Sequence, residues 1–154
     1  MDNPARYDTL YLSGTPPGAV AERFGTFPEW GDWLTEHPRG FRLRLVTFDL
    51  PDDRAVLDLD DADALAQRSL RPSRVVTRDR ATTQRWARAA FDEAQWSGVA
   101  WWSYHDPDWM SCGLWSAVGA RAIDGLTVID RTDLSADHPA VVAASQSLLR
   151  VWVP

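Results

Sequence analysis

Hydrophobic and polar positions follow two different periods along the chain, and each period predicts its own kind of element. Alternation with period two, typical of a half-buried strand, is clearest over 41–50, where Phe41, Leu43 and Leu45 alternate with arginines. Short apolar runs bounded by turn residues indicate further strands. The expected strands lie at 9–13, 41–50, 55–59, 99–103, 113–118, 126–129 and 148–153.

Helical patterns are fewer. Helices are expected over 17–24, 82–94 and 139–147. Thr15 is a natural cap for the first helix and is followed by two prolines, which suit a first helical turn. Thr82 or Thr83 is expected to cap the second helix. One face of this helix carries apolar residues at helical spacing, namely Trp86, Ala89, Ala90 and Phe91.

The balance of these elements predicts the fold class. Strands outnumber helices and do not alternate strictly with them, which favours an α+β fold with a mixed sheet core and a few flanking helices. A chain of 154 residues has room for one domain, over 1–154. The stretch 25–40 is expected to be a loop whose Trp30 and Trp33 could form an apolar lid. The acidic run 58–63 is interpreted as helix and turn capping.

Composition narrows the classes of function. All sixteen basic residues are arginine, and the net charge of −6 argues against a general nucleic-acid binder and against a polybasic membrane anchor. Most of the nine tryptophans are expected in the core, with one or two free to line a pocket. The single cysteine, Cys112, excludes an internal disulfide. No signal peptide or membrane-length apolar run is recognised, which predicts a cytoplasmic location.

Common catalytic motifs do not occur, and three scattered histidines predict no metal site. The remaining candidates are Tyr11 and Ser103, each at the end of an expected strand, and Glu22 on an otherwise apolar helix. Each also has an ordinary interpretation. Tyr11 could be a core aromatic residue, Glu22 a solvated helix position and Ser103 a strand terminus. The residues alone leave both interpretations open.

The order of segments resembles the RES domain, a bacterial family named for its arginine, glutamate and serine. Members are often the toxin of a toxin–antitoxin pair, encoded beside a helix-turn-helix antitoxin. The similar segments are, in chain order, 7–12, 19–22, 57–59, 83–89, 98–103 and 138–153. The eleven-residue step from Tyr11 to Glu22 is part of the resemblance.

The resemblance implies a fold like that of ADP-ribosyltransferase toxins and cleavage of the nicotinamide–ribose bond of NAD+, with phosphate or water as acceptor. NAD+ is then a substrate, and no cofactor is expected. The implied catalytic residues are Glu22, Ser103 and Arg6, and the implied substrate-binding residues are Tyr11, Arg23 and Trp102. Arg6 is the single arginine before Tyr11 and lies closer to it in the sequence than the arginines of the family pattern do. If Arg6 does not contact the phosphate, the phosphate-binding role falls to Arg23 or another residue.

The chemistry suits these residue types. Nicotinamide leaves as a neutral molecule while positive charge builds on the ribose, so a carboxylate such as Glu22 would stabilise the transition state. Tyr11 could stack on nicotinamide, and Ser103 could hold its amide or the adjoining ribose. Two alternatives remain: an ADP-ribosyltransferase acting on a protein, and a noncatalytic RES-like binding module. Expected partners are NAD+, phosphate and a helix-turn-helix (Xre-like) antitoxin, with no nucleic acid and no membrane; a homodimer stays open.

Overall fold

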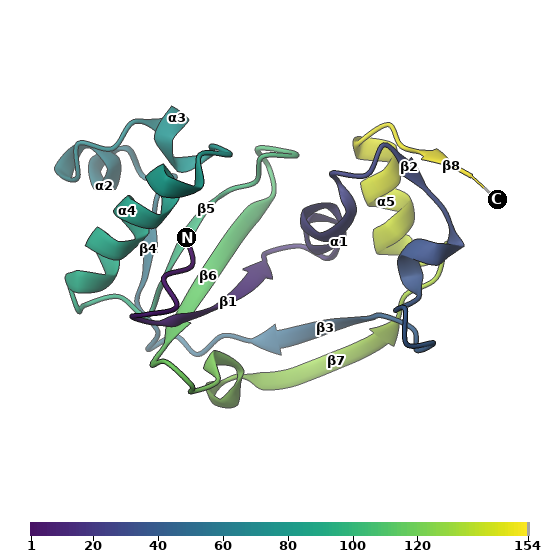
Figure 1. Ribbon diagram of the computed structural model, residues 1–154, viewed down its shortest axis with the longest axis horizontal. Coiled ribbons are helices and arrows are strands. Elements are labelled where there is room, and N and C mark those ends of the chain that lie inside the picture. Colours follow the sequence, from purple (N-terminus) through teal and green to yellow (C-terminus); the bar gives the residue numbers. More distant parts are fainter. Residues whose placement is uncertain (154) are drawn as a thin grey trace.

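The computed structural model describes residues 1–153, and its elements form two lobes connected by a long β-ribbon (Figure 1). The first lobe holds a four-stranded sheet in the order β1-β6-β5-β4, made of β1 (Asp8–Ser13), β6 (Met110–Ser116), β5 (Gly98–Trp102) and β4 (Val56–Asp58). Helices α2 (Ala62–Gln67), α3 (Pro72–Val75) and α4 (Arg80–Asp92) pack beside it. The C-terminal end of the described chain lies in the other lobe.

The second lobe is built from α1 (Pro16–Phe24) and α5 (Pro139–Ser147), which pack against each other. Beside them lie the short parallel pair of β2 (Glu29–Trp30) and β8 (Val151–Trp152), and the 3-10 helix η1 (Asp32–Thr35). The ribbon consists of β3 (Arg44–Asp49) antiparallel to β7 (Thr127–Asp133), with the 3-10 helix η2 (Ala122–Gly125) just before β7.

Strand directions confirm the α+β class and the mixed sheet that the sequence predicts. Strands β1 and β5 both run antiparallel to β6, whereas β4 runs parallel to β5. In this register Ser13 lies opposite Ser111, and Ser111 also lies opposite Trp101 on the other side of β6. The end of β1 and the end of β5 therefore lie on either side of the start of β6, next to the start of α1. The likeness to ADP-ribosyltransferase toxins and the single-domain assignment stay predictions.

Helix caps agree with the sequence in one case and correct it in another. The Thr15 hydroxyl accepts the Gly18 N–H at 3.2 Å and begins α1 as expected. Helix α4 begins earlier than predicted, because the Asp79 carboxylate accepts both the N–H and the hydroxyl of Thr82, at 3.2 and 2.7 Å. A carboxylate at a helix N-terminus also interacts favourably with the helix dipole, so Asp79 takes the capping position that was assigned to Thr82 or Thr83.

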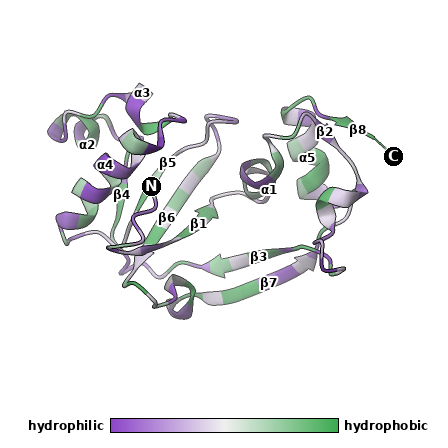
Figure 2. Cartoon of the chain, viewed as in Figure 1, coloured by the Kyte–Doolittle hydropathy of each residue, from purple (hydrophilic) through white to green (hydrophobic). Residues whose placement is uncertain are grey.

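Each lobe has its own hydrophobic cluster. In the sheet lobe, Tyr7, Leu59 and Val99 are fully buried, together with residues of α2 to α4. In the other lobe, α1 and α5 bury their apolar faces together, and Figure 2 shows α5 mostly hydrophobic while α4 alternates along its length. Trp30 belongs to this second cluster and is fully buried, whereas Trp33 is half exposed and contacts Phe27 edge-on. The prediction that these two tryptophans form an apolar lid is therefore wrong.

Other local differences are small. The expected loop over 25–40 contains β2 and η1, and α3 was not expected at all. The capping interpretation of the acidic run fits, since Asp61 accepts the Asp63 N–H at 2.9 Å at the start of α2. Among residues 1–153, no helix has the length and apolar character needed to cross a bilayer.

The single thiol lies in the middle of the sheet. Cys112 sits on β6, opposite Leu12 on one side and Ala100 on the other, and is 5% exposed. Burial raises the pKa of this thiol to about 11. Cys112 is thus a packing residue of the sheet, as its environment of Leu114 and neighbouring aliphatic side chains indicates.

Candidate active site

The fold of α1 decides where Glu22 lies. Val20, Ala21 and Phe24 face the core of the second lobe and are buried, so the intervening Glu22 and Arg23 occupy the opposite, exposed side of the helix. Because α1 follows β1 after a short turn, this side faces the sheet edge where β1, β5 and β6 meet. A helix with one apolar face thereby brings a carboxylate to the junction of the two lobes.

Two buried serines hold the Glu22 carboxylate. The Ser103 hydroxyl donates to Glu22 Oε1 at 2.6 Å, and the Ser111 hydroxyl donates to the same oxygen at 3.1 Å. Both serines are only 3% exposed. Ser103 Oγ also accepts the His105 N–H at 3.0 Å, which fixes the hydroxyl hydrogen toward Glu22. The oxygen Oε1 is thus occupied, and within residues 1–153 no hydrogen bond is made to Oε2.

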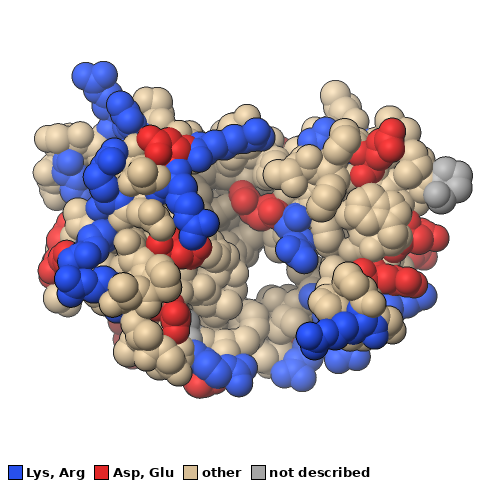
Figure 3. Space-filling model, in the orientation of Figure 1, with Lys and Arg blue, Asp and Glu red and all other residues tan. Residues whose placement is uncertain are grey.

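Glu22 lines a pocket of about 210 Å³, called here the Glu22 pocket. Figure 3 shows this face of the molecule hollowed between the two lobes. Aromatic side chains and one arginine form part of the lining, namely Tyr11, Trp86, Trp101, Tyr104 and Arg78, and the other lining residues are Met1, Val75, Val76, Thr77 and Thr83. The pocket therefore combines one anchored carboxylate, flat aromatic walls and a guanidinium group, as ligand sites with a few convergent polar groups do.

Tyr11 is fixed at the pocket by two contacts. Its hydroxyl donates to Asp2 Oδ1 at 2.6 Å, and its ring stands edge-on to Trp101 with centroids 6.5 Å apart. Partial burial, followed by the hydrogen bond to Asp2, raises the pKa of the Tyr11 phenol well above its usual range. The phenol is consequently neutral at physiological pH and is an aromatic wall with a hydrogen-bonded edge.

The arginine that the structure brings to the pocket differs from those that the sequence singles out. Arg6 lies in an exposed turn before β1, and neither Arg6 nor Arg23 is among the lining residues. The Arg23 guanidinium lies 6.0 Å from the ring centroid of Phe24, on its own helix. Arg78 lines the pocket, with its guanidinium carbon 4.9 Å from the ring centroid of Tyr104. It follows α3, an element without a clear sequence signal, so sequence analysis missed it.

Two further side chains differ from the sequence expectation. Trp101 lines the Glu22 pocket, whereas Trp102 is not among the lining residues, although both tryptophans pack against the core cluster of the sheet lobe. Adjacent strand residues point to opposite faces, so the two indoles cannot share the pocket wall. Ser111 was missed, although a serine within an apolar strand is a recognisable signal for a buried polar contact. Ser103 was expected at the substrate, but its hydroxyl is directed to Glu22.

The donor set does not resemble a metal centre. Among residues 1–153, no group of three or more histidine, cysteine or acidic side chains is arranged to hold a metal ion. The pocket offers instead the fixed negative charge of Glu22 beside aromatic surfaces and the positive charge of Arg78. Such an arrangement can stabilise a cationic sugar while a flat heterocycle and an anionic group are held nearby.

Comparison with known proteins adds one finding. The family model described as the RES domain matches residues 2–141, a range that includes every residue of the Glu22 pocket except Met1. Comparison with curated proteins gave no match, and comparison with solved structures gave none.

Proposed function

Because the chain belongs to the RES domain family, we propose that it is an NAD+-degrading enzyme, a phosphorylase or glycohydrolase, and the toxin of a toxin–antitoxin pair. The family is linked to NAD-related toxins, and the sequence resemblance extends to the tyrosine, glutamate and serine positions. One observation carries the proposal: the Glu22 carboxylate is anchored by two buried serines at a pocket that Tyr11 also lines.

The proposed reaction needs no proton donor from the protein for the leaving group. When the bond between ribose C1 and the pyridinium nitrogen breaks, its electron pair neutralises the nitrogen, and nicotinamide departs without a proton. Positive charge develops on the ribose, and the fixed carboxylate of Glu22 stabilises it. An oxygen of phosphate or water then bonds to C1, and where water is the acceptor one of its protons passes to the solvent. Since Ser103 and Ser111 hold Oε1, the carboxylate is preorganised and does not reorient during the reaction.

The remaining pocket residues receive roles from their chemistry. Tyr11 offers a neutral ring for the flat nicotinamide, with Trp101 behind it. Arg78 replaces Arg6 and Arg23 as the proposed binder of the pyrophosphate or of the acceptor phosphate, because a guanidinium suits phosphate oxygens and Arg78 lines the pocket. A helix-turn-helix (Xre-like) protein remains the proposed antitoxin.

The decisive experiment measures NAD+ loss with and without phosphate, using the full chain and a Glu22→Gln variant. This substitution keeps the shape of the side chain and the acceptor for the two serines but removes the negative charge. We expect NAD+ loss to fall at least about 100-fold, because the lost term is charge stabilisation in the transition state. Glu36→Gln, which changes an exposed glutamate outside the pocket, is the matched control.

The products identify the reaction class. Dependence on phosphate with formation of an ADP-ribose phosphate supports the phosphorylase, and free ADP-ribose supports the glycohydrolase. Label from NAD+ that appears on protein would instead show an ADP-ribosyltransferase. If the chain neither consumes NAD+ nor is stabilised by it against heat, the noncatalytic binding module is favoured and the enzymatic proposal is wrong.

A further inference from the structure

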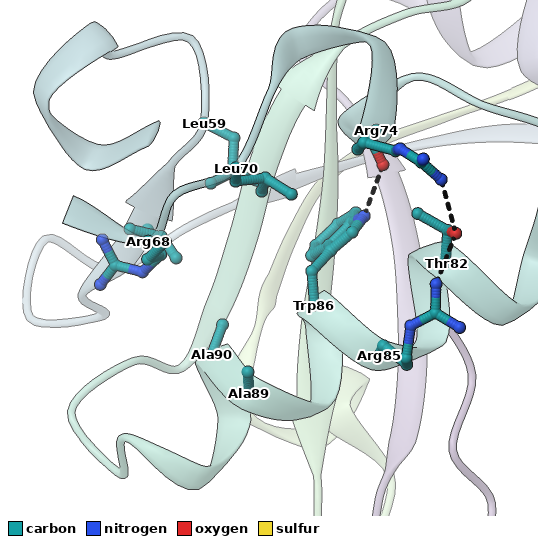
Figure 4. A pocket seen from close by; sticks show the side chains of 10 residues that line it. Leu59, Arg68, Leu70, Arg74, Thr82, Arg85, Trp86, Ala89 and Ala90 are labelled. Atoms are coloured by element: carbon teal, nitrogen blue, oxygen red, sulfur yellow. Dashed lines mark hydrogen bonds between the residues drawn. The ribbon is translucent and has the colours of Figure 1, made fainter. Parts of the chain in front are cut away.

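A second and larger pocket lies on the other side of Trp86. It measures about 400 Å³ and is called here the α4 pocket (Figure 4). Its lining residues are Leu57, Leu59, Arg68, Leu70, Arg74, Thr82, Arg85, Trp86, Ala89 and Ala90. Trp86 is the single lining residue that it shares with the Glu22 pocket. Glu22 and Tyr11 do not line it, so the α4 pocket is a separate site.

The inner wall of the α4 pocket is apolar and well fixed. Leu57 and Leu59 are 2% and 0% exposed and belong to the core of the sheet lobe. The Trp86 indole is held in place because its Nε1–H donates to the Arg74 carbonyl oxygen at 2.9 Å. The core leucines support the partly exposed Trp86 indole and Leu70, which form a surface on which an apolar ring system can lie.

Two arginines converge at the rim of the α4 pocket without a direct carboxylate partner, and the Asp79 carboxylate lies one hydrogen bond away through Thr82. Arg85 Nη2 donates to Thr82 Oγ1 at 2.9 Å, and Arg74 Nη1 donates to the same oxygen at 3.5 Å, as Figure 4 shows. The Thr82 hydroxyl hydrogen goes to Asp79, so this hydroxyl is fully used. Within residues 1–153, neither guanidinium lies within 4.0 Å of a carboxylate oxygen. Most of their N–H donors are therefore free.

The third arginine of the lining differs in this respect. Arg68 forms a bidentate pair with Glu93, at 2.6 and 2.9 Å, and its charge is neutralised. The surrounding sequence is nevertheless basic, since residues 68–88 contain seven of the sixteen arginines and one acid, Asp79. Arg68, Arg80 and Arg88 pair with acids, so the positive charge at the α4 pocket comes from Arg74 and Arg85.

We propose that the α4 pocket is a binding site for an organic anion. An apolar ring body of the ligand lies against Trp86 and Leu70, and its carboxylate, sulfonate or phosphate group is bound by Arg74 and Arg85. Paired guanidinium groups recognise such oxyanions through parallel, charge-assisted hydrogen bonds. The proposal does not depend on the reaction at Glu22, and an inactive chain would retain this site.

The test uses two dyes that share an apolar body and differ in charge. The probe is 1-anilinonaphthalene-8-sulfonate, and the reference is N-phenyl-1-naphthylamine, which lacks the sulfonate. We expect the full chain to bind one sulfonate dye. The double variant Arg74→Gln with Arg85→Gln should weaken this binding at least about tenfold and leave the neutral dye within about twofold, because only charge-assisted bonds are lost.

A matched control removes the same charge elsewhere. Arg71→Gln with Arg80→Gln changes two exposed arginines of the same basic segment that do not line the α4 pocket, and it should leave both dyes unaffected. Ala89→Trp, which fills the pocket from an exposed position on α4, should weaken both dyes. Unfolding midpoints of all variants establish that the fold is retained.

Three outcomes would overturn the proposal. The first is equal affinity of the sulfonate dye for the full chain and for the Arg74 and Arg85 double variant. The second is an equal loss of affinity for both dyes in that variant. The third is complete displacement of the sulfonate dye by NAD+, which would make the α4 pocket part of a single substrate site. None of these outcomes concerns NAD+ loss, so they are independent of the function proposed for Glu22.

Discussion

The two serines that hold Glu22 allow positioning to be separated from direct catalysis. Ser103→Ala removes a hydrogen bond of 2.6 Å and Ser111→Ala removes one of 3.1 Å, both to the same carboxylate oxygen. A hydrogen bond to a charged group contributes about 1.5–3 kcal/mol when both partners are buried, and less here because Glu22 itself is exposed. The shorter bond should contribute more.

Ser103→Ala also has an effect on stability that Ser111→Ala lacks. The His105 N–H donates to Ser103 Oγ at 3.0 Å and would lose its acceptor. We therefore expect the free energy of unfolding to fall by about 2 kcal/mol for Ser103→Ala and by about 1 kcal/mol for Ser111→Ala. Urea unfolding followed by tryptophan fluorescence measures both values. Ser116→Ala, on the same strand but bonded to the Ala120 carbonyl, is the control and should change little.

The activity of these variants reports on Glu22. A carboxylate that has lost one of its two anchors samples unproductive orientations, so kcat for NAD+ loss should fall about tenfold in Ser103→Ala and less in Ser111→Ala. KM should stay nearly constant, because neither serine hydroxyl is directed to the substrate. In a Glu22→Gln background, adding Ser103→Ala should cause almost no further loss, since the serine acts through the missing charge.

Two results would refute this reasoning. An equal loss of kcat on adding Ser103→Ala in the wild-type and Glu22→Gln backgrounds would show that the serine acts on the substrate itself. A large rise in KM with unchanged kcat would show that it contributes ground-state binding. Either result would return Ser103 to the substrate-contacting role that the sequence resemblance implies.

Two further predictions concern charge. Arg78→Gln should raise KM for NAD+ about tenfold with a smaller change in kcat, because one charge-assisted contact is lost; Arg71→Gln, at an exposed arginine that lines neither pocket, is the control, and an unchanged KM would exclude Arg78 from binding. Hydrogen bonds from Arg68 hold the pKa of Glu93 at about 2, against an ordinary value of 4.5. The lowered pKa adds stability above pH 4.5, and this stability is lost as pH falls toward 2. Glu93→Gln should therefore lower the free energy of unfolding at pH 7 by about 1 kcal/mol, allowing for the partial exposure of Glu93. The variant should also lose less stability than the wild type between pH 4.5 and pH 2. Thermal melts between pH 2 and pH 7 measure the effect, and the same loss of stability at low pH in the variant and the wild type would contradict it.

Local patterns predicted much of the framework. The threonine and prolines before α1 determine where that helix begins, and its buried positions determine that Glu22 faces away from the core of its lobe. Period-two alternation located β3, and apolar runs located β5 and β6, because these signals depend on neighbouring residues alone. The identification of Glu22, Tyr11 and Ser103 as candidates also needed only their places on these elements and a family resemblance.

The features that were missed depend on contacts between distant segments. Ser111 reaches Glu22 from 89 positions away, and nothing in the sequence near either residue records their pairing. Arg78 reaches the Glu22 pocket through a short helix without a clear sequence signal. The cap of α4 was missed for a different reason. Asp79, Thr82 and Thr83 all have capping side chains, and the geometry of the turn decides between them.

The position of Cys112 makes its thiol an internal reporter of local opening at the central sheet. The thiol is buried among aliphatic side chains on one face of the sheet, and at neutral pH its high pKa leaves almost none of it as the reactive thiolate. An alkylating reagent can therefore modify the chain only after the packing over this face of the central sheet opens and exposes the sulfur. Since no other cysteine competes, the rate of alkylation follows the opening equilibrium of that sheet, with no label to introduce and no residue to replace.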